Sequence, residues 1–195
     1  PGAWEYQVEA IIDGVFRSNG AYAPAYTNIV ASGPGACILH YVENDRRMQD
    51  GELLLVDAGC ELDWYAADIT RTWPVGGRFS GPQRAVYQLV LDAQVAAIAE
   101  VRTGTSNHEI QDHTVRHLTT GMVDLGLLSG DVDALIEDES YKRFYMHGIG
   151  HYLGMDVHDV GSYREADGTS RLLKPGMVMT IEPSLYIAED DEAAP

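Results

Sequence analysis

The segment Tyr-Met-His-Gly-Ile-Gly-His-Tyr-Leu-Gly-Met-Asp-Val-His-Asp-Val-Gly occupies residues 145–161 and decides how the rest of the sequence is interpreted. It places three histidines, His147, His151 and His158, among four glycines. The glycines argue against a core helix, because each one costs roughly 1 kcal/mol relative to alanine in a helix interior. The apolar residues between them argue against a flexible linker. We therefore expect a rigid, turn-rich segment that presents imidazole groups at a functional site.

The composition is that of a folded globular protein, and it narrows the range of partners. The chain has 195 residues, 45% of them hydrophobic, and a formal net charge of −17. Such an acidic chain is a poor match for nucleic acid or an anionic membrane surface. Its two cysteines, Cys37 and Cys60, predict no disulfide framework. No apolar run approaches the ~20 residues that span a bilayer, and we expect a reduced, cytoplasmic location.

Hydrophobic periodicity predicts one domain of helices and short strands, without an internal linker. Helices are expected at residues 1–19, 82–101, 107–125 and 132–137. Strands are expected at residues 28–31, 36–41, 52–58, 65–73 and 177–181, with a turn or hairpin at residues 59–64. The strand at 36–41 would carry His40, and the strand at 177–181 would end at Glu182.

Acidic residues stand in or at the ends of these strands, where burial of a charge is costly. Asp57 follows Leu-Leu-Leu-Val, Asp68 lies within Ala-Asp-Ile, and Glu182 follows Met-Thr-Ile. Together with His151 they make an oxygen-rich ligand set with one nitrogen, which suits Mn²⁺, Co²⁺, Fe²⁺ or Zn²⁺. Carboxylates that bridge also suit two metals about 3.5–4 Å apart that share a water.

Each of these residues also has a structural explanation. Asp57 could end its strand in a turn, Asp68 could pair with Arg71, and Glu182 could be an exposed strand end. Any single histidine is more often a hydrogen-bonded packing residue than a ligand. A common cation accounts for all of them together, whereas the structural explanations must each hold separately.

Five segments give the chain a resemblance to a known family. They are residues 38–41, 56–61, 67–74, 146–161 and 180–183. In these segments the chain resembles the catalytic domain of the pita-bread metallopeptidases, the family of methionine aminopeptidase, prolidase and aminopeptidase P. Asp57 and Asp68 keep the eleven-residue separation of the family's aspartate ligands. Val-Asp-Ala-Gly-Cys-Glu and Asp-Ile-Thr-Arg-Thr are more similar to aminopeptidase P than to prolidase.

The resemblance implies an α+β pita-bread fold, an antiparallel sheet backed by helices, over residues 1–195. It implies two divalent metal ions, usually manganese in this branch, bound by Asp57, Asp68, His151 and Glu182. Asp68 would bridge both ions.

The resemblance also implies an activity, which is release of the N-terminal residue from peptides with proline second. A metal-bridging hydroxide would attack the peptide carbonyl, and Glu182 would accept its proton. His40 and His158 would steady the tetrahedral intermediate, and His147 would lie near the leaving proline.

Two departures separate the chain from the family pattern. The family's second glutamate ligand lies on a strand after the Glu-Pro motif, and that strand falls beyond residue 195. We expect the acids at 189–192 to be solvated rather than to replace it. Ser184 stands where the family usually has glycine. The sequence thus predicts a domain incomplete at both ends, with its C-terminal strands missing and its activity impaired.

Two other functions fit the same motifs. Prolidase, an Xaa-Pro dipeptidase, shares much of the histidine-rich segment. A non-catalytic pita-bread module that binds peptides or proteins would use the fold without metal. Retention of the acidic residues argues against the metal-free binding module. A separate expectation is that the parent protein forms a homo-oligomer.

Overall fold

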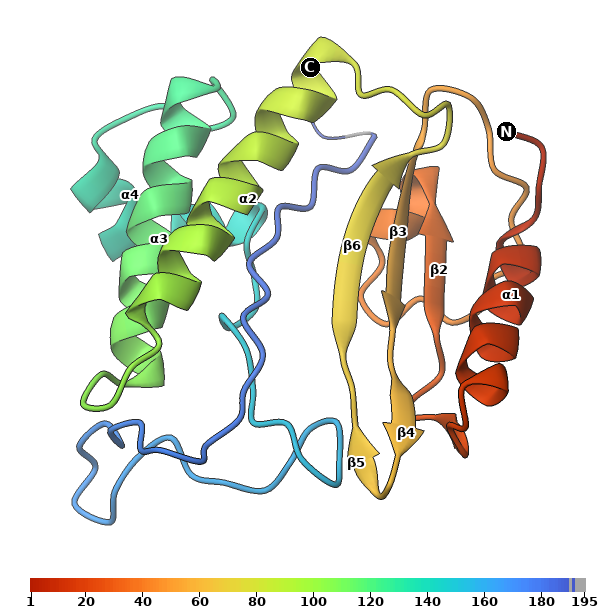
Figure 1. Cartoon of the computed structure of the whole chain (residues 1–195). Helices are drawn as coiled ribbons and strands as arrows, with labels where there is room; N and C mark the ends of the chain where they lie inside the picture. The colour runs from red at the N-terminus through yellow and green to blue at the C-terminus, as the bar shows by residue number, and fades with distance from the viewer. Residues whose placement is uncertain (190, 192–195) are drawn as a thin grey trace. The chain divides into compact units, whose positions relative to one another are not determined.

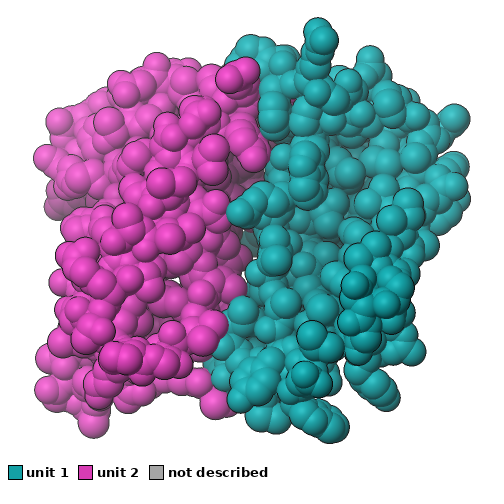
Figure 2. Space-filling view, viewed as in Figure 1, with its two compact units in different colours: residues 1–81, 153–159 teal, residues 82–152, 160–195 magenta. Residues whose placement is uncertain are grey.

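The computed structural model describes residues 1–189 and 191. The chain divides into two compact units, residues 1–81 with 153–159 and residues 82–152 with 160–195 (Figure 2). The first unit contains the sheets, and the second contains the long helices α2 and α3 (Figure 1). The expectation of a single domain stays a prediction.

The first unit combines one α-helix, a short 3₁₀ helix and two antiparallel sheets in its described residues. The sheets have the strand orders β2-β3-β6 and β1-β4-β5. The elements are α1 (Glu5–Ser18), β1 (Ala23–Pro24), β2 (Ile29–Ser32), η1 (Gly33–Cys37), β3 (Leu53–Ala58), β4 (Cys60–Leu62), β5 (Tyr65–Ala66) and β6 (Ile69–Pro74).

A buried carboxylate fastens α1 to this unit. Glu5 is fully buried, and it accepts hydrogen bonds from the backbone N–H and the hydroxyl of Ser32, both at 2.6 Å. The Tyr41 hydroxyl donates to its other oxygen at 2.8 Å, and the Arg46 backbone N–H does so at 2.9 Å. Four donors satisfy the charge, which would otherwise be very costly to bury.

The register of β3 and β6 places Asp57 and Asp68 on one face of the sheet. Asp57 lies opposite Thr70, and Asp68 precedes Thr70 by two residues. Side chains alternate along a strand, so residues two apart share a face. The predicted strand at 65–73 is interrupted at 67–68, so Asp68 lies just before β6 rather than inside a strand.

Glycine at position 59 permits this interruption. A Cβ atom on Gly59 would overlap the carbonyl oxygen of Ala67. The Ala67 backbone N–H also donates to the Cys60 carbonyl oxygen at 3.0 Å. Two stretches of backbone therefore lie close together between the two aspartates.

Two sequence-based expectations in this unit are wrong. Residues 36–41 do not form a strand, because Gly33–Cys37 forms η1 with Pro34 in its first turn. His40 then adopts a left-handed conformation with φ of 56°, which no strand can include. The N-terminal helix begins at Glu5, not at Pro1.

The second unit contains four helical elements among its described residues. They are α2 (Gly81–Glu100, whose first residue belongs to the first unit), α3 (Asn107–Asp124), α4 (Val132–Glu137) and η2 (Ser140–Arg143). Helix α3 begins as its sequence predicts, with Ser106 and Glu109 in a reciprocal capping box.

Buried apolar side chains anchor the histidine-rich segment in the second unit. Tyr145 packs with Leu118 and Met122 of α3, and Ile149 packs with Ile110 and Leu173. Tyr145 and Ile149 are both fully buried. His147 and His151 each follow one of these anchors by two residues, so their backbone is fixed by the core.

Residues 177–181 do not form the predicted strand. They make one bridge, between Tyr152 and Met179, and the Thr180 N–H donates to the His151 carbonyl oxygen at 2.9 Å. The Glu182 N–H donates to the Ile149 carbonyl oxygen at 2.8 Å. The pairing nonetheless brings Glu182 beside the histidine-rich segment.

The C-terminal acids differ from the expectation in part. Asp191 is not a solvated acid, because it forms an ion pair with Arg143 at 2.5 Å. Glu189 is exposed, as expected, whereas residues 190 and 192 lie outside the described part of the chain. Within that part, no helix is long and apolar enough to cross a membrane.

We predict that Gly59→Ala destabilises the protein by at least about 2 kcal/mol, because the added methyl group must displace backbone. Gly14→Ala is the control, since Gly14 lies in α1 with open space around its Cα. That change should stabilise the protein by about 0.5–1 kcal/mol. Thermal denaturation measures both. Equal melting temperatures for Gly59→Ala and the wild type would contradict the close approach.

Candidate metal centre

In the first unit, Asp57 and Asp68 meet at the hydroxyl group of Tyr26. The Tyr26 hydroxyl contacts Oδ1 of Asp57 in a short hydrogen bond and Oδ1 of Asp68 at 2.9 Å. Both carboxylates are half-buried, and Thr70 also forms a side-chain hydrogen bond to Asp57. The sheet register therefore gathers two carboxylates around one atom.

This crowding changes the acidity of the groups involved. Burial raises the pKa of Asp57 to about 6, and the neighbouring Asp68 charge adds to the rise, while the hydrogen bond from Tyr26 opposes it. Burial and the two acids also raise the pKa of Tyr26 above its ordinary range. Two like charges in a partly desolvated place favour a bound proton or a cation between them. The donor set therefore fits a hard or borderline divalent metal.

Two histidines lie near each other in the same unit. The ring centroids of His40 and His158 are 6.4 Å apart. His158 belongs to this unit because residues 153–159 pack on it, and the Ala66 N–H donates to the Gly154 carbonyl oxygen at 2.8 Å. Both histidines are exposed.

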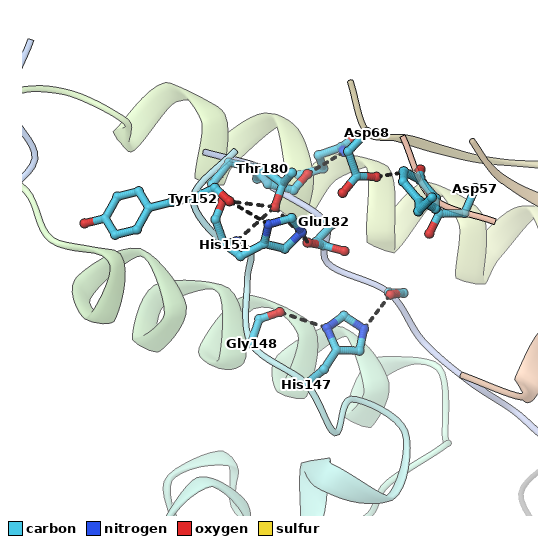
Figure 3. A network of polar contacts seen from close by, with 12 residues as sticks. Asp57, Asp68, His147, Gly148, His151, Tyr152, Thr180 and Glu182 are labelled. Atoms are coloured by element: carbon cyan, nitrogen blue, oxygen red, sulfur yellow. Dashed lines mark hydrogen bonds and ion pairs between the residues drawn. The ribbon is translucent and has the colours of Figure 1, made fainter. Parts of the chain in front are cut away.

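In the second unit, His151 and Glu182 form the second predicted ligand pair (Figure 3). Nδ1 of His151 lies 2.9 Å from the Tyr152 carbonyl oxygen, which can only accept a hydrogen bond. A neutral His151 therefore carries its proton on Nδ1 and a lone pair on Nε2. Nε2 lies 3.2 Å from Oε1 of Glu182, so a lone pair faces a carboxylate. A proton or a metal ion resolves that contact, and a backbone acceptor on Nδ1 is typical of metal-ligating histidines.

Thr180 orients this second pair. Its hydroxyl donates to Oε1 of Glu182 at 2.7 Å and accepts the His151 backbone N–H at 2.9 Å (Figure 3). Gly150 makes this possible, because any side chain there would overlap the Thr180 carbonyl group.

His147 is held by a separate set of contacts in the second unit. Its Nδ1 lies 2.8 Å from the Gly148 carbonyl oxygen, so Nδ1 is the donor (Figure 3). Nε2 then accepts from the Ser184 hydroxyl at 2.9 Å or from the Tyr186 hydroxyl at 3.2 Å. Ser184 thus takes part in orienting His147.

The predicted ligand set is shared between the two units, with Asp57 and Asp68 in the first and His151 and Glu182 in the second. Among residues 1–189 and 191, no group of three or more His, Cys, Asp or Glu side chains has the geometry to hold a metal ion. Each unit therefore holds one predicted ligand pair, and the two pairs are considered separately.

Sequence reasoning missed the hydroxyl groups that orient these pairs. Tyr26 lies between two short strands, where no periodicity singles it out, and its role depends on which strands pair. Thr180 lies two residues before the predicted ligand Glu182, yet its contacts depend on the pairing with residues 149–152.

We predict that without metal the contribution of the Asp57 carboxyl group to stability falls as the pH rises from about 4 to about 6. The folded-state pKa of Asp57 lies above the ordinary value of 3.8, so the folded state binds the proton more tightly than the unfolded state does. That stabilisation is complete below pH 4 and is lost as the pH rises through 6. The difference in melting temperature between wild type and Asp57→Asn should therefore change across this range in the presence of a chelator. A difference that is independent of pH would refute the shift.

We also predict that Thr180→Val destabilises the protein by about 1–3 kcal/mol, since it leaves the His151 N–H without its side-chain acceptor. Thr180→Ser keeps the hydroxyl group and should restore most of the loss. Chemical denaturation compares the two variants. If the serine variant is as unstable as the valine variant, the hydroxyl group is not responsible.

Known proteins resemble this chain over nearly its whole length. The family model for metallopeptidase family M24 matches residues 1–194. The chain is 54% identical to the Xaa-Pro aminopeptidase of Haemophilus influenzae over 97% of this chain and 44% of that protein. It is 50% identical to the Xaa-Pro aminopeptidase of Escherichia coli over 98% of this chain and 43% of that protein. The chain thus spans less than half the length of these curated relatives.

Solved structures give the same result. Aminopeptidase PepP of Pseudomonas aeruginosa matches with a TM-score of 0.97 and 56% identity, over 100% of this chain and 44% of that chain. A zinc-substituted aminopeptidase P of Escherichia coli in complex with product matches with a TM-score of 0.94 and 50% identity, over 98% and 43% of the two chains. These matches confirm the predicted α+β pita-bread fold and the resemblance to aminopeptidase P. The chain belongs to metallopeptidase family M24.

Proposed function

We propose that this chain supplies the larger part of the catalytic machinery of an Xaa-Pro aminopeptidase, which releases the N-terminal residue of a peptide whose second residue is proline. The observation that carries the proposal is the pair of half-buried carboxylates, Asp57 and Asp68, gathered at one hydroxyl group. Two Xaa-Pro aminopeptidases that are at least 50% identical to the chain support the substrate class.

In this proposal, Asp57, Asp68, His151 and Glu182 bind two divalent cations, with Mn²⁺ as the preferred metal. The donor set supports a divalent cation of this kind, because three carboxylates and one imidazole suit a borderline or hard cation. Such cations lower the pKa of a bound water and polarise the peptide carbonyl group. Asp68 would help to hold both cations.

The remaining roles fall to side chains that touch the substrate. His40 and His158, whose rings lie 6.4 Å apart, are proposed to donate hydrogen bonds to the carbonyl oxygen as negative charge develops there. Glu182 is proposed to take the proton of the attacking water and pass it to the leaving amine. His147 is proposed to contact the proline side of the substrate, with its orientation set by Gly148 and Ser184.

Metal binding is the first test. The chain, freed of metal, should bind Mn²⁺ in a calorimetric titration, and Asp57→Asn should weaken binding at least about 100-fold, because even residues behind the ligands contribute about 10- to 100-fold. Asp63→Asn is the matched control. Asp63 lies exposed in the turn between β4 and β5 with φ of 51°, a conformation that asparagine tolerates. A wild-type chain that binds no metal would support a non-catalytic module instead.

Peptide hydrolysis is the second test. Any turnover by the chain should require Mn²⁺, release the first residue of an Xaa-Pro-Yaa tripeptide, and spare the matching Xaa-Ala-Yaa peptide. Glu182→Gln should abolish this turnover. Preference for the Xaa-Pro dipeptide over the tripeptide would indicate prolidase and overturn the proposal.

A further inference from the structure

Tyr26 makes contacts in the first unit that the proposed ligand set alone does not explain. It lies in the connection between β1 and β2, and its side chain is half-buried. A tyrosine that only filled space would need one hydrogen-bond partner at most. Tyr26 instead reaches the carboxylates of both β3 and the segment before β6.

The backbone on both sides of Tyr26 is fixed to the strands that carry these carboxylates. The N–H of Ala25 donates to the Gly59 carbonyl oxygen at 2.9 Å. On the other side, Ile29 of β2 lies directly opposite Asp57 of β3. The phenol is therefore held by pairing around residues 57–59, not by a mobile loop.

The hydroxyl group contacts one oxygen of each acid. Both hydrogen bonds end on Oδ1, so one oxygen of Asp57 and one of Asp68 converge on the same atom. The phenol has one proton and no charge, so its O–H donates to one carboxylate at a time and neutralises neither of them. The negative charge of the two carboxylates therefore remains available to a cation.

We propose that Tyr26 is a positioning residue for the metal centre, whose hydroxyl group holds Asp57 and Asp68 in the arrangement that binds the cation. The inference rests on the proposed function, because it requires these two acids to be metal ligands. Groups behind the ligands typically contribute about 10- to 100-fold to metal affinity. The phenol hydroxyl of Tyr26 should contribute within this range.

The test compares Tyr26→Phe with the wild type in a calorimetric titration of the metal-free chain with Mn²⁺. The variant keeps the ring and loses the hydroxyl group, so affinity should fall about 10- to 100-fold. Tyr22→Phe is the control, since Tyr22 lies four residues away, just before β1, and is 78% exposed. Its affinity should equal that of the wild type. Equal affinity for Tyr26→Phe and the wild type would overturn the inference and leave the proposed function standing.

A second measurement does not depend on the variant being folded. In wild-type chain with ring-labelled tyrosine, titration with diamagnetic Zn²⁺ should shift the Tyr26 resonance, because the cation binds to the acids that its hydroxyl group contacts, and leave the Tyr22 resonance in place. Zinc binding without a shift at Tyr26 would refute the positioning role. A wild-type chain that binds neither Mn²⁺ nor Zn²⁺ would overturn the proposed function, and this inference with it.

Discussion

The proximity of two like charges on one face of a sheet is the constraint on which the first unit depends. Unit charges about 4 Å apart interact with on the order of 4 kcal/mol at an effective dielectric constant of about 20. The register of β3 and β6, the missing side chain of Gly59 and the hydroxyl group of Tyr26 all hold Asp57 and Asp68 together against such repulsion. A fold that maintains this contact gains from any cation that binds between them, since binding to the folded state alone stabilises it.

The second unit reaches a similar result by a different route. Its ligand pair does not lie on neighbouring strands, because residues 177–181 make only one bridge to the histidine-rich segment. Burial of Tyr145 and Ile149 in the core fixes the backbone instead, and Gly150 lets the Thr180 chain approach. Helix α3 supplies much of that core. The buried apolar residues of the histidine-rich segment therefore fix the backbone that carries His147 and His151.

The sequence predicted features that depend on local pattern, and it failed where distant pairing decides. The strand expected at residues 52–58 corresponds to β3, and the helix expected from residue 107 corresponds to α3. Residues 36–41 are apolar enough for a strand, yet Gly33 and Pro34 start a 3₁₀ turn that displaces it. The predicted ligands were identified by resemblance and by the cost of burying acids. No local sequence pattern identifies the Tyr26 hydroxyl group, because only the pairing of β1 and β2 with other strands brings this group to Asp57 and Asp68.

The two proposed ligand pairs share one chemical feature that bears on metal binding. A neutral hydroxyl group orients each of them, Tyr26 for the aspartates and Thr180 for Glu182. An arginine or lysine in either place would also satisfy the carboxylates, but its positive charge would compete with the metal for them. A hydroxyl group fixes the direction of a carboxylate and leaves its charge almost intact. Neutral donors therefore let the fold prepare the ligands in advance, while the attraction for a divalent cation is preserved.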